Sequence, residues 1–168
     1  GIFEYKILNP SKDIIFHVEA NSISSQDYKI KVITVPSISN FEMQLIFPRY
    51  LNKKQDIIKG TGNAVIPEGT RVTWKMNTLA TQNADWIDAN TTISFLKIDN
   101  TFVLSKNIFQ NTDYQIITSN NKVKNHEKLN YQLSVIKDQY PVINVNNAPD
   151  SLKVGKNYVL GQISDDHG

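Results

Sequence analysis

Apolar and polar residues alternate along most of this chain, and helical periodicity is nearly absent. In the five clearest segments the apolar positions are Phe16, Val18 and Ala20; Tyr28, Ile30 and Val32; Phe41, Met43, Leu45 and Phe47; Val72, Trp74 and Met76; and Leu129, Tyr131, Leu133 and Val135. Mostly polar residues fill the intervening positions, so each segment has one apolar face and one polar face. The pattern is typical of antiparallel strands in two layers and predicts an all-β sandwich.

Turn-forming residues separate these predicted strands. Turns are predicted at Ile66-Pro67-Glu68-Gly69, at Asp99-Asn100 and at Ser119-Asn120-Asn121. The segment Ile93–Ile98 is predicted to be one strand that enters the Asp99-Asn100 hairpin. Residues 81–90 form the longest polar segment of the middle region, and we interpret them as an exposed connector.

The chain also repeats itself at long range. An alternating strand around Tyr28 leads to Pro36, and a similar strand around Tyr131 leads to Pro141, at separations of 103 and 105 positions. A period near 100 residues matches the size of one β-sandwich module. We predict that Tyr28 and Tyr131 occupy equivalent core or corner positions.

The repeat predicts tandem modules of an immunoglobulin-like β-sandwich. Residues 37–141 are predicted to form one complete module. Residues 1–36 are predicted to supply the C-terminal strands of a preceding module, and residues 142–168 the first strands of a following one. Two isolated strands are marginally stable in water. The terminal segments should therefore pack on the middle module or be completed by strand exchange between copies.

Several segments resemble one known family. They are Phe47–Leu51, Asn63–Trp74, Tyr131–Pro141, Asp150-Ser151 and Gly161–Gly168. Over most of its length from about residue 28, the chain resembles large membrane-anchored proteins of Bacteroidetes, a family of unknown function. The resemblance implies an N-terminal membrane anchor, tandem immunoglobulin-like modules outside the membrane and a long helical C-terminal region in the parent protein. It therefore implies a periplasmic or extracytoplasmic location, and it brings no catalytic residues.

Charge and composition narrow the classes of partner. The net charge is +2 and the basic residues are dispersed, which argues against a nucleic-acid partner. No apolar run approaches the roughly 18 residues of a membrane helix, so we predict no membrane contact by this segment itself. The chain has no cysteine, which excludes disulfides, thiolate metal sites and a cysteine nucleophile.

Two acidic residues form the candidate metal site. Asp165 and Asp166 follow a predicted strand and are adjacent carboxylates, a type of ligand that Ca²⁺ prefers. The alternative is a polar turn that ends at Gly168. We predict no other cofactor.

No residue cluster amounts to a catalytic signature. The histidines His17, His126 and His167 lie far apart, and no Gly-x-Ser-x-Gly nucleophile elbow is present. The Gly60-Thr61-Gly62 run is followed by neither the Lys-Ser/Thr of a phosphate loop nor a helical pattern. We therefore predict that the chain is not an enzyme.

The two tryptophans predict different roles. Trp74 shares its face with Val72 and Met76, which places it in the core. Trp86 lies between Asp85 and Asp88 in the polar connector, where an exposed indole could stack on a sugar or anchor a partner. The alternative is that Trp86 tucks over the end of the sandwich.

The sequence therefore predicts a non-catalytic structural and interaction module of a larger cell-envelope protein. It would act as a spacer and as a surface for a protein partner of unknown identity, with exposed sheet edges available for strand addition. The rival hypothesis is a carbohydrate-binding module that holds a glycan at Trp86, Asp85 and Asp88.

Overall fold

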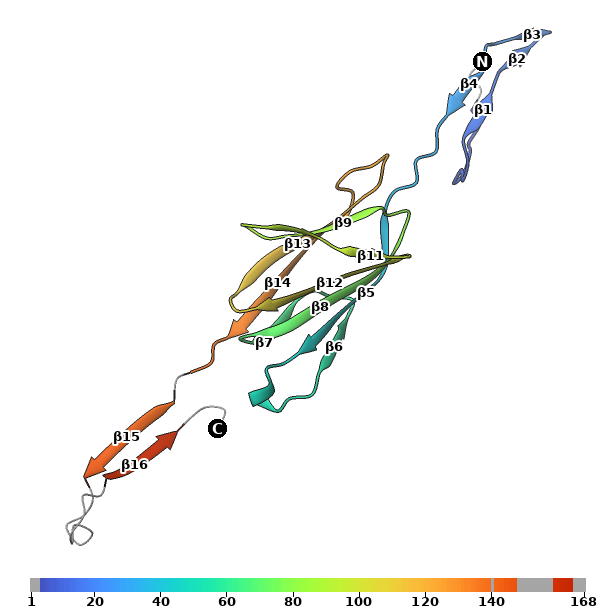
Figure 1. Cartoon of the computed structure of the whole chain (residues 1–168). Coiled ribbons are helices and arrows are strands. Elements are labelled where there is room, and N and C mark those ends of the chain that lie inside the picture. Colours follow the sequence, from blue (N-terminus) through green and yellow to red (C-terminus); the bar gives the residue numbers. More distant parts are fainter. Residues whose placement is uncertain (1–3, 140, 148–158, 165–168) are drawn as a thin grey trace.

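The computed structural model describes residues 4–139, 141–147 and 159–164, and these residues confirm the predicted all-β fold. Among them the only helical element is a 3₁₀ turn, η1 (Arg49–Leu51). Two five-stranded sheets form the main body, and three two-stranded sheets lie outside it (Figure 1).

The first large sheet is antiparallel throughout. Its spatial order is β11 (Leu96–Ile98), β12 (Thr101–Ile108), β8 (Thr70–Leu79), β5 (Ser37–Ile46) and β6 (Asp56–Lys59). The second large sheet has the order β10 (Thr92–Ser94), β9 (Asn83–Ile87), β13 (Thr112–Ser119), β14 (Lys128–Ile136) and β7 (Ala64–Pro67). In this sheet β7 runs parallel to β14, whereas the other neighbours are antiparallel.

The inner faces of the two sheets form a single apolar core. The first sheet contributes Phe41, Met43, Leu45, Val72, Trp74, Met76, Phe102 and Ile108, and the second contributes Ile66, Ala84, Trp86, Tyr114, Ile116 and Leu133. The inward faces predicted for β5, β8 and β14 are confirmed, because period-two alternation puts every second side chain of a strand on the same face. The main body is therefore a β-sandwich.

The chain changes sheets at Phe95. Ile93–Ile98 was predicted as one strand, and this prediction is wrong: β10 ends at Ser94 in one sheet and β11 begins at Leu96 in the other. Phe95 is buried between them, and its N–H donates to the Ala84 carbonyl over 2.9 Å. The apolar alternation shifts by one residue at the adjacent Phe95 and Leu96, and a shift within so short a segment did not predict the change of sheet.

The predicted turns are present. Gly69 follows β7 with a φ of +77°, and Asp99 closes the β11–β12 hairpin with a φ of 54°. Both angles lie in the left-handed region, which glycine enters freely and aspartate tolerates. β13 ends at Ser119, where the third turn was predicted.

Two short hairpins precede the sandwich. β1 (Ile14–Phe16) pairs with β4 (Tyr28–Ile30), and β2 (Glu19–Ala20) pairs with β3 (Ile23–Ser24). Tyr28 stacks on Phe16 with ring centroids 5.6 Å apart, yet it is 45% exposed. Of the two predicted placements, core or corner, the core placement of Tyr28 is wrong, because no second sheet among the described residues covers its face.

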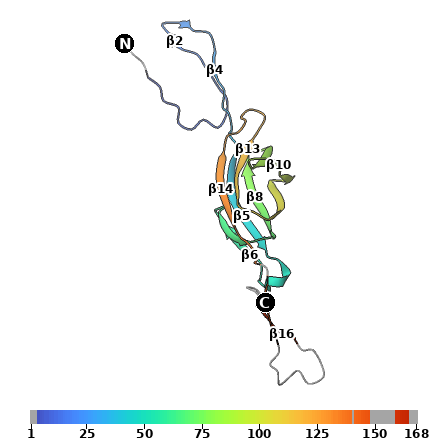
Figure 2. The same cartoon turned by 90° about the vertical axis from the view of Figure 1, so that its left-hand side faces the viewer.

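A third hairpin follows the sandwich. β15 (Val142–Asn147) pairs with β16 (Val159–Ser164) in the antiparallel sense. The terminal hairpins project from opposite ends of the sandwich in both views (Figures 1 and 2). The molecule is therefore elongated, with its compact core in the middle.

One side chain ties the N-terminal hairpins to the sandwich. The Asn120 Nδ2 donates to the Thr34 carbonyl over 2.9 Å and to the Ala80 carbonyl over 3.0 Å. Its Oδ1 accepts from the backbone N–H groups of Lys122 and Val123, which holds the turn after β13 in place. The turn after β13 is thus hydrogen-bonded to the segment that leads into β5.

Candidate functional site

Trp86 is not an exposed loop residue, and that prediction is corrected. Asn83–Ile87 is strand β9, and the Trp86 side chain is fully buried. Its ring stacks on Tyr114 at 5.4 Å and lies 5.8 Å from Trp74. Only Ala84 and Trp86 point inward from this short strand, and polar neighbours hid the alternation. No face of Trp86 is available to stack on a sugar.

The side chain of Lys106 lies over the Trp86 ring. The Lys106 Nζ, from β12, lies 4.0 Å from the centroid of the Trp86 ring and 3.3 Å from the Asp88 Oδ2. This cation–π contact and ion pair join the two sheets at one margin of the core. The Trp86 Nε1 is buried and has no hydrogen-bond partner among the described residues.

Asp85 and Asp88 stabilise the β9–β10 hairpin. The Asp85 Oδ1 accepts from the Ser94 hydroxyl over 2.7 Å, across a directly opposed pair of residues. The Asp88 Oδ1 accepts from the backbone N–H groups of Asn90 and Thr91 and from the Thr91 hydroxyl. Both predicted ligand-binding carboxylates are thus engaged within the protein.

The environment of Asp88 keeps it ionised. Burial raises its pKa, but the hydrogen bonds from Asn90, Thr91 and Lys106 outweigh this and lower the pKa to about 2. A carboxylic acid with that pKa holds no proton to donate near neutral pH. Asp88 is therefore suited to stabilising the fold through its hydrogen bonds and not to general acid catalysis.

A polar groove runs over the outer part of the β9–β13–β14 sheet. It has a volume of about 700 Å³, and its polar lining is Asn63, Asp88, Asp113, Gln115, Asn130 and Gln132. Internal hydrogen bonds already join the Gln132 Nε2 to Asp113 and the Gln132 N–H to the Asn63 Oδ1. Tyr114 and Tyr131 also line the groove, and the lining contains no histidine and no lysine.

A buried polar centre lies inside the core, at the Tyr114 hydroxyl. Its hydroxyl accepts from the Trp74 Nε1 over 2.8 Å, donates to the Gly62 carbonyl over 2.7 Å and lies 3.6 Å from the Met43 Sδ. Burial raises the pKa of Tyr114 well above its ordinary value, so the hydroxyl keeps its proton. Sequence reasoning missed this centre, because the partners come from segments far apart along the chain.

Gly62 allows that centre to form. A Cβ at this position would collide with the Tyr114 hydroxyl and the Tyr131 ring. The Gly60-Thr61-Gly62 run therefore serves close packing against two tyrosines. The strand β7 follows it, and not a helix, as the sequence predicted.

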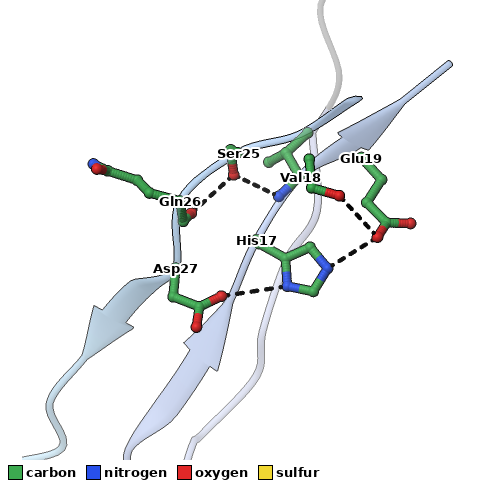
Figure 3. A network of polar contacts seen from close by, with 7 residues as sticks. His17, Val18, Glu19, Ser25, Gln26 and Asp27 are labelled. Atoms are coloured by element: carbon green, nitrogen blue, oxygen red, sulfur yellow. Dashed lines mark hydrogen bonds and ion pairs between the residues drawn. The ribbon is translucent and has the colours of Figure 1, made fainter. Parts of the chain in front are cut away.

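Of the three sequence-distant histidines, the structure describes His17 and His126, and His167 lies outside the described residues. His17 lies in the N-terminal hairpins, where its Nε2 is 3.3 Å from the Glu19 Oε1 and its Nδ1 is 3.5 Å from the Asp27 Oδ1 (Figure 3). The neighbouring hydroxyls of Ser24 and Ser25 donate instead to Glu19 and to the Gln26 carbonyl. Neither serine is held against the imidazole as a nucleophile would be.

The candidate calcium ligands Asp165 and Asp166 lie outside the described residues. Within the part of the chain that the structure describes, no group of three or more histidine, aspartate or glutamate side chains could hold a metal ion. A search of the same residues found no helix long and apolar enough to cross a membrane.

Comparison of the chain with protein-family models and with curated proteins found no match.

Proposed function

We propose that this chain is a non-catalytic structural and interaction module of a larger cell-envelope protein. It is built from tandem immunoglobulin-like sandwiches, spaces other domains along the molecule and offers a surface to a protein partner. The resemblance to membrane-anchored Bacteroidetes proteins supports a periplasmic or extracytoplasmic location.

The connectivity of the sandwich supports an immunoglobulin-like fold. From β8 onward, β8, β12 and β11 neighbour one another in one sheet, while β10, β9, β13 and β14 form the other. This is the arrangement of strands B, E and D against C′, C, F and G in that fold. The strand β5 lies beside β8 as strand A does, and the β7–β14 pair is parallel, as expected when the first strand switches sheets.

Two aromatic positions add to this support. Trp86 lies on the strand that corresponds to C, where immunoglobulin domains carry a buried tryptophan. Trp74 and Tyr114 lie on the strands corresponding to B and F, which a disulfide joins in antibody domains. Here the hydrogen bond between Trp74 and Tyr114 links the same two strands.

The observation that carries the tandem arrangement is a shared register. In the β13–β14 hairpin Tyr114 pairs with Tyr131, and in the β1–β4 hairpin Phe16 pairs with Tyr28. The sequence repeat equates Tyr28 with Tyr131, so the pairing equates Phe16 with Tyr114. Both pairs bring their rings together, at 5.6 Å and 5.7 Å. The hairpin β1–β4 thus corresponds to the last hairpin of a sandwich.

The elongated form supports a role as a spacer. The terminal hairpins extend the sandwich in opposite directions (Figure 1). The outer strands β6, β7, β10 and β11 leave sheet edges to which a partner strand could be added.

Small-angle X-ray scattering of the whole chain tests the spacer role. We expect the profile of a rod-like particle, with a maximum dimension well beyond that of the sandwich alone. A compact profile, with the hairpins folded back on the sandwich, would contradict the proposal. The reading frame around this chain gives a second test: an upstream membrane segment and further modules of the same period support the proposal, whereas an adjoining catalytic domain would indicate an accessory role.

A further inference from the structure

The outer face of the second large sheet carries a regular array of amide and carboxylate side chains. Asp113 of β13 lies directly opposite Gln132 of β14, and Gln115 lies opposite Asn130. Directly opposed residues on one face of an antiparallel pair have Cβ atoms about 5 Å apart. These four exposed residues and Asn63 supply most of the polar lining of the groove of about 700 Å³ described above. We call the five residues the amide array.

Internal hydrogen bonds hold part of the amide array in place. The Gln132 Nε2 donates to the Asp113 Oδ1 over 2.9 Å, and the Asn63 Oδ1 accepts from the Gln132 N–H over 2.7 Å. Each of these three side chains therefore uses one polar atom within the protein and keeps the other for a ligand: the Asn63 Nδ2, the Gln132 Oε1 and the Asp113 Oδ2. Because the side chains are already ordered, a ligand has fewer of them to immobilise when it binds.

The two remaining members of the array keep their full hydrogen-bonding capacity. The side chains of Gln115 and Asn130 make no hydrogen bond to another described residue. A side-chain amide carries two N–H donors and a carbonyl acceptor with two lone pairs. The array thus presents donors and acceptors at short intervals, which suits a ligand whose own groups both donate and accept. Hydroxyl groups have this property, and a saccharide carries several of them close together.

The charge of the groove limits the class of saccharide. Among the described residues that line it, none is lysine, arginine or histidine, and Asp113 forms no ion pair. Asp88 also lines the groove, but Lys106 and the β9–β10 turn already occupy its carboxylate. The carboxylate of Asp113 therefore repels an anionic ligand, and no cation in the lining attracts one.

The position of the groove argues against a peptide as its ligand. Extended peptides bind chiefly by adding a strand at a sheet edge, with pockets for alternate side chains. The amide array lies on the face of the sheet, on two paired inner strands. Among the described lining residues only Ile87 and Ala89 are aliphatic, which is little apolar surface for the side chains of a peptide.

We propose that this groove binds a neutral saccharide through the amide array. The site differs from the one that the sequence predicted around Trp86, because that indole is buried on the inner face of the same sheet. All five residues lie within the sandwich, so the inference depends neither on the tandem arrangement nor on the terminal hairpins. It adds a ligand to the proposed function.

A glycan array that holds neutral and anionic oligosaccharides tests this inference with the whole chain. We expect binding to neutral glycans and none to anionic ones. In a nuclear magnetic resonance titration with the best-bound neutral oligosaccharide, the side-chain amide signals of Gln115 and Asn130 should shift. Gln115→Ala and Asn130→Ala should each weaken binding about tenfold, and the double variant should abolish it. Both side chains are exposed, so the variants should unfold in urea as the unaltered chain does.

Asn77→Ala is the matched control. It removes an exposed amide from the outer face of β8, in the other large sheet, and should bind as the unaltered chain does. Four results would each overturn the inference: a silent array, a preference for anionic glycans, binding that the double variant retains, and amide signals that shift with a mixture of unstructured peptides but with no glycan. Each of them leaves the spacer role standing, because that role is tested by the shape of the particle.

Discussion

At the scale of single residues, the Tyr114 hydroxyl is a fully buried polar link between the two sheets. It bonds β8 through the indole of Trp74 and bonds the segment before β7 through the Gly62 carbonyl. All three groups are buried, and the chain has no cysteine that could supply a covalent link. Buried polar groups are costly when left without partners, so this link should be a sensitive point of the fold.

Replacing Tyr114 with phenylalanine should therefore destabilise the protein well beyond the loss of one oxygen. The change leaves the Trp74 Nε1 and the Gly62 carbonyl without their partner, and each such group costs about 1–3 kcal/mol. We expect the free energy of unfolding to fall by roughly 2–4 kcal/mol in urea titrations followed by tryptophan fluorescence. Tyr28→Phe, at an exposed position outside the sandwich, is the matched control and should change little.

Asp88 makes stability depend on pH in the acid range. Its pKa is about 2 in the folded protein against an ordinary value of 3.8, so folding favours the ionised form. The resulting stability is present above about pH 4 and is lost as pH falls toward 2. Asp88→Asn should lower the urea midpoint near neutral pH, and the gap to the unaltered chain should close toward pH 2. A gap that is constant with pH would contradict this account.

At the scale of strands, sequence pattern predicted the long elements and missed some of the short ones, namely β9 and the division between β10 and β11. In β5 and β8 the alternation runs for ten residues, and their inward residues were identified correctly. In β9 only two residues point inward among polar neighbours, so the strand was interpreted as a connector. Strand β10 was merged with β11 because the chain crosses between the sheets at an apolar residue.

In the candidate site, too, the sequence predicted only part of what the structure shows. Asp85 and Asp88 were identified from the sequence as a notable pair of carboxylates. Their partners Ser94 and Lys106 come from β10 and β12, and only the strand pairing brings them together. The sequence could therefore indicate which side chains are polar and closely spaced, but not that the fold already occupies them.

Truncating Trp86 tests the corrected role of β9. Because the side chain fills space between Trp74 and Tyr114, Trp86→Ala should leave a cavity and cost about 3–5 kcal/mol of unfolding free energy. Val65→Ala, at an exposed position of β7, should stay within about 0.5 kcal/mol of the unaltered chain. Urea titrations measure both changes. A variant of unchanged stability would restore the loop interpretation of Trp86.

At the scale of the whole molecule, the apolar core occupies only the middle part of an elongated chain. Every residue of the core cluster lies between Phe41 and Leu133. Among the described residues the terminal hairpins pair only within themselves, and a two-stranded hairpin is marginally stable alone. Most of the stability of the chain should therefore belong to the sandwich.

A fragment of residues 37–139 should accordingly fold on its own. It keeps both five-stranded sheets and the contact of the Ile38 N–H with the Glu127 carboxylate. It loses the Asn120 bond to the Thr34 carbonyl, which as a single exposed hydrogen bond is worth about 0.5–1.5 kcal/mol. We expect urea unfolding to give a free energy within about 1.5 kcal/mol of the whole chain. A fragment that is unfolded, or weaker by several kcal/mol, would show that the hairpins belong to the folding unit.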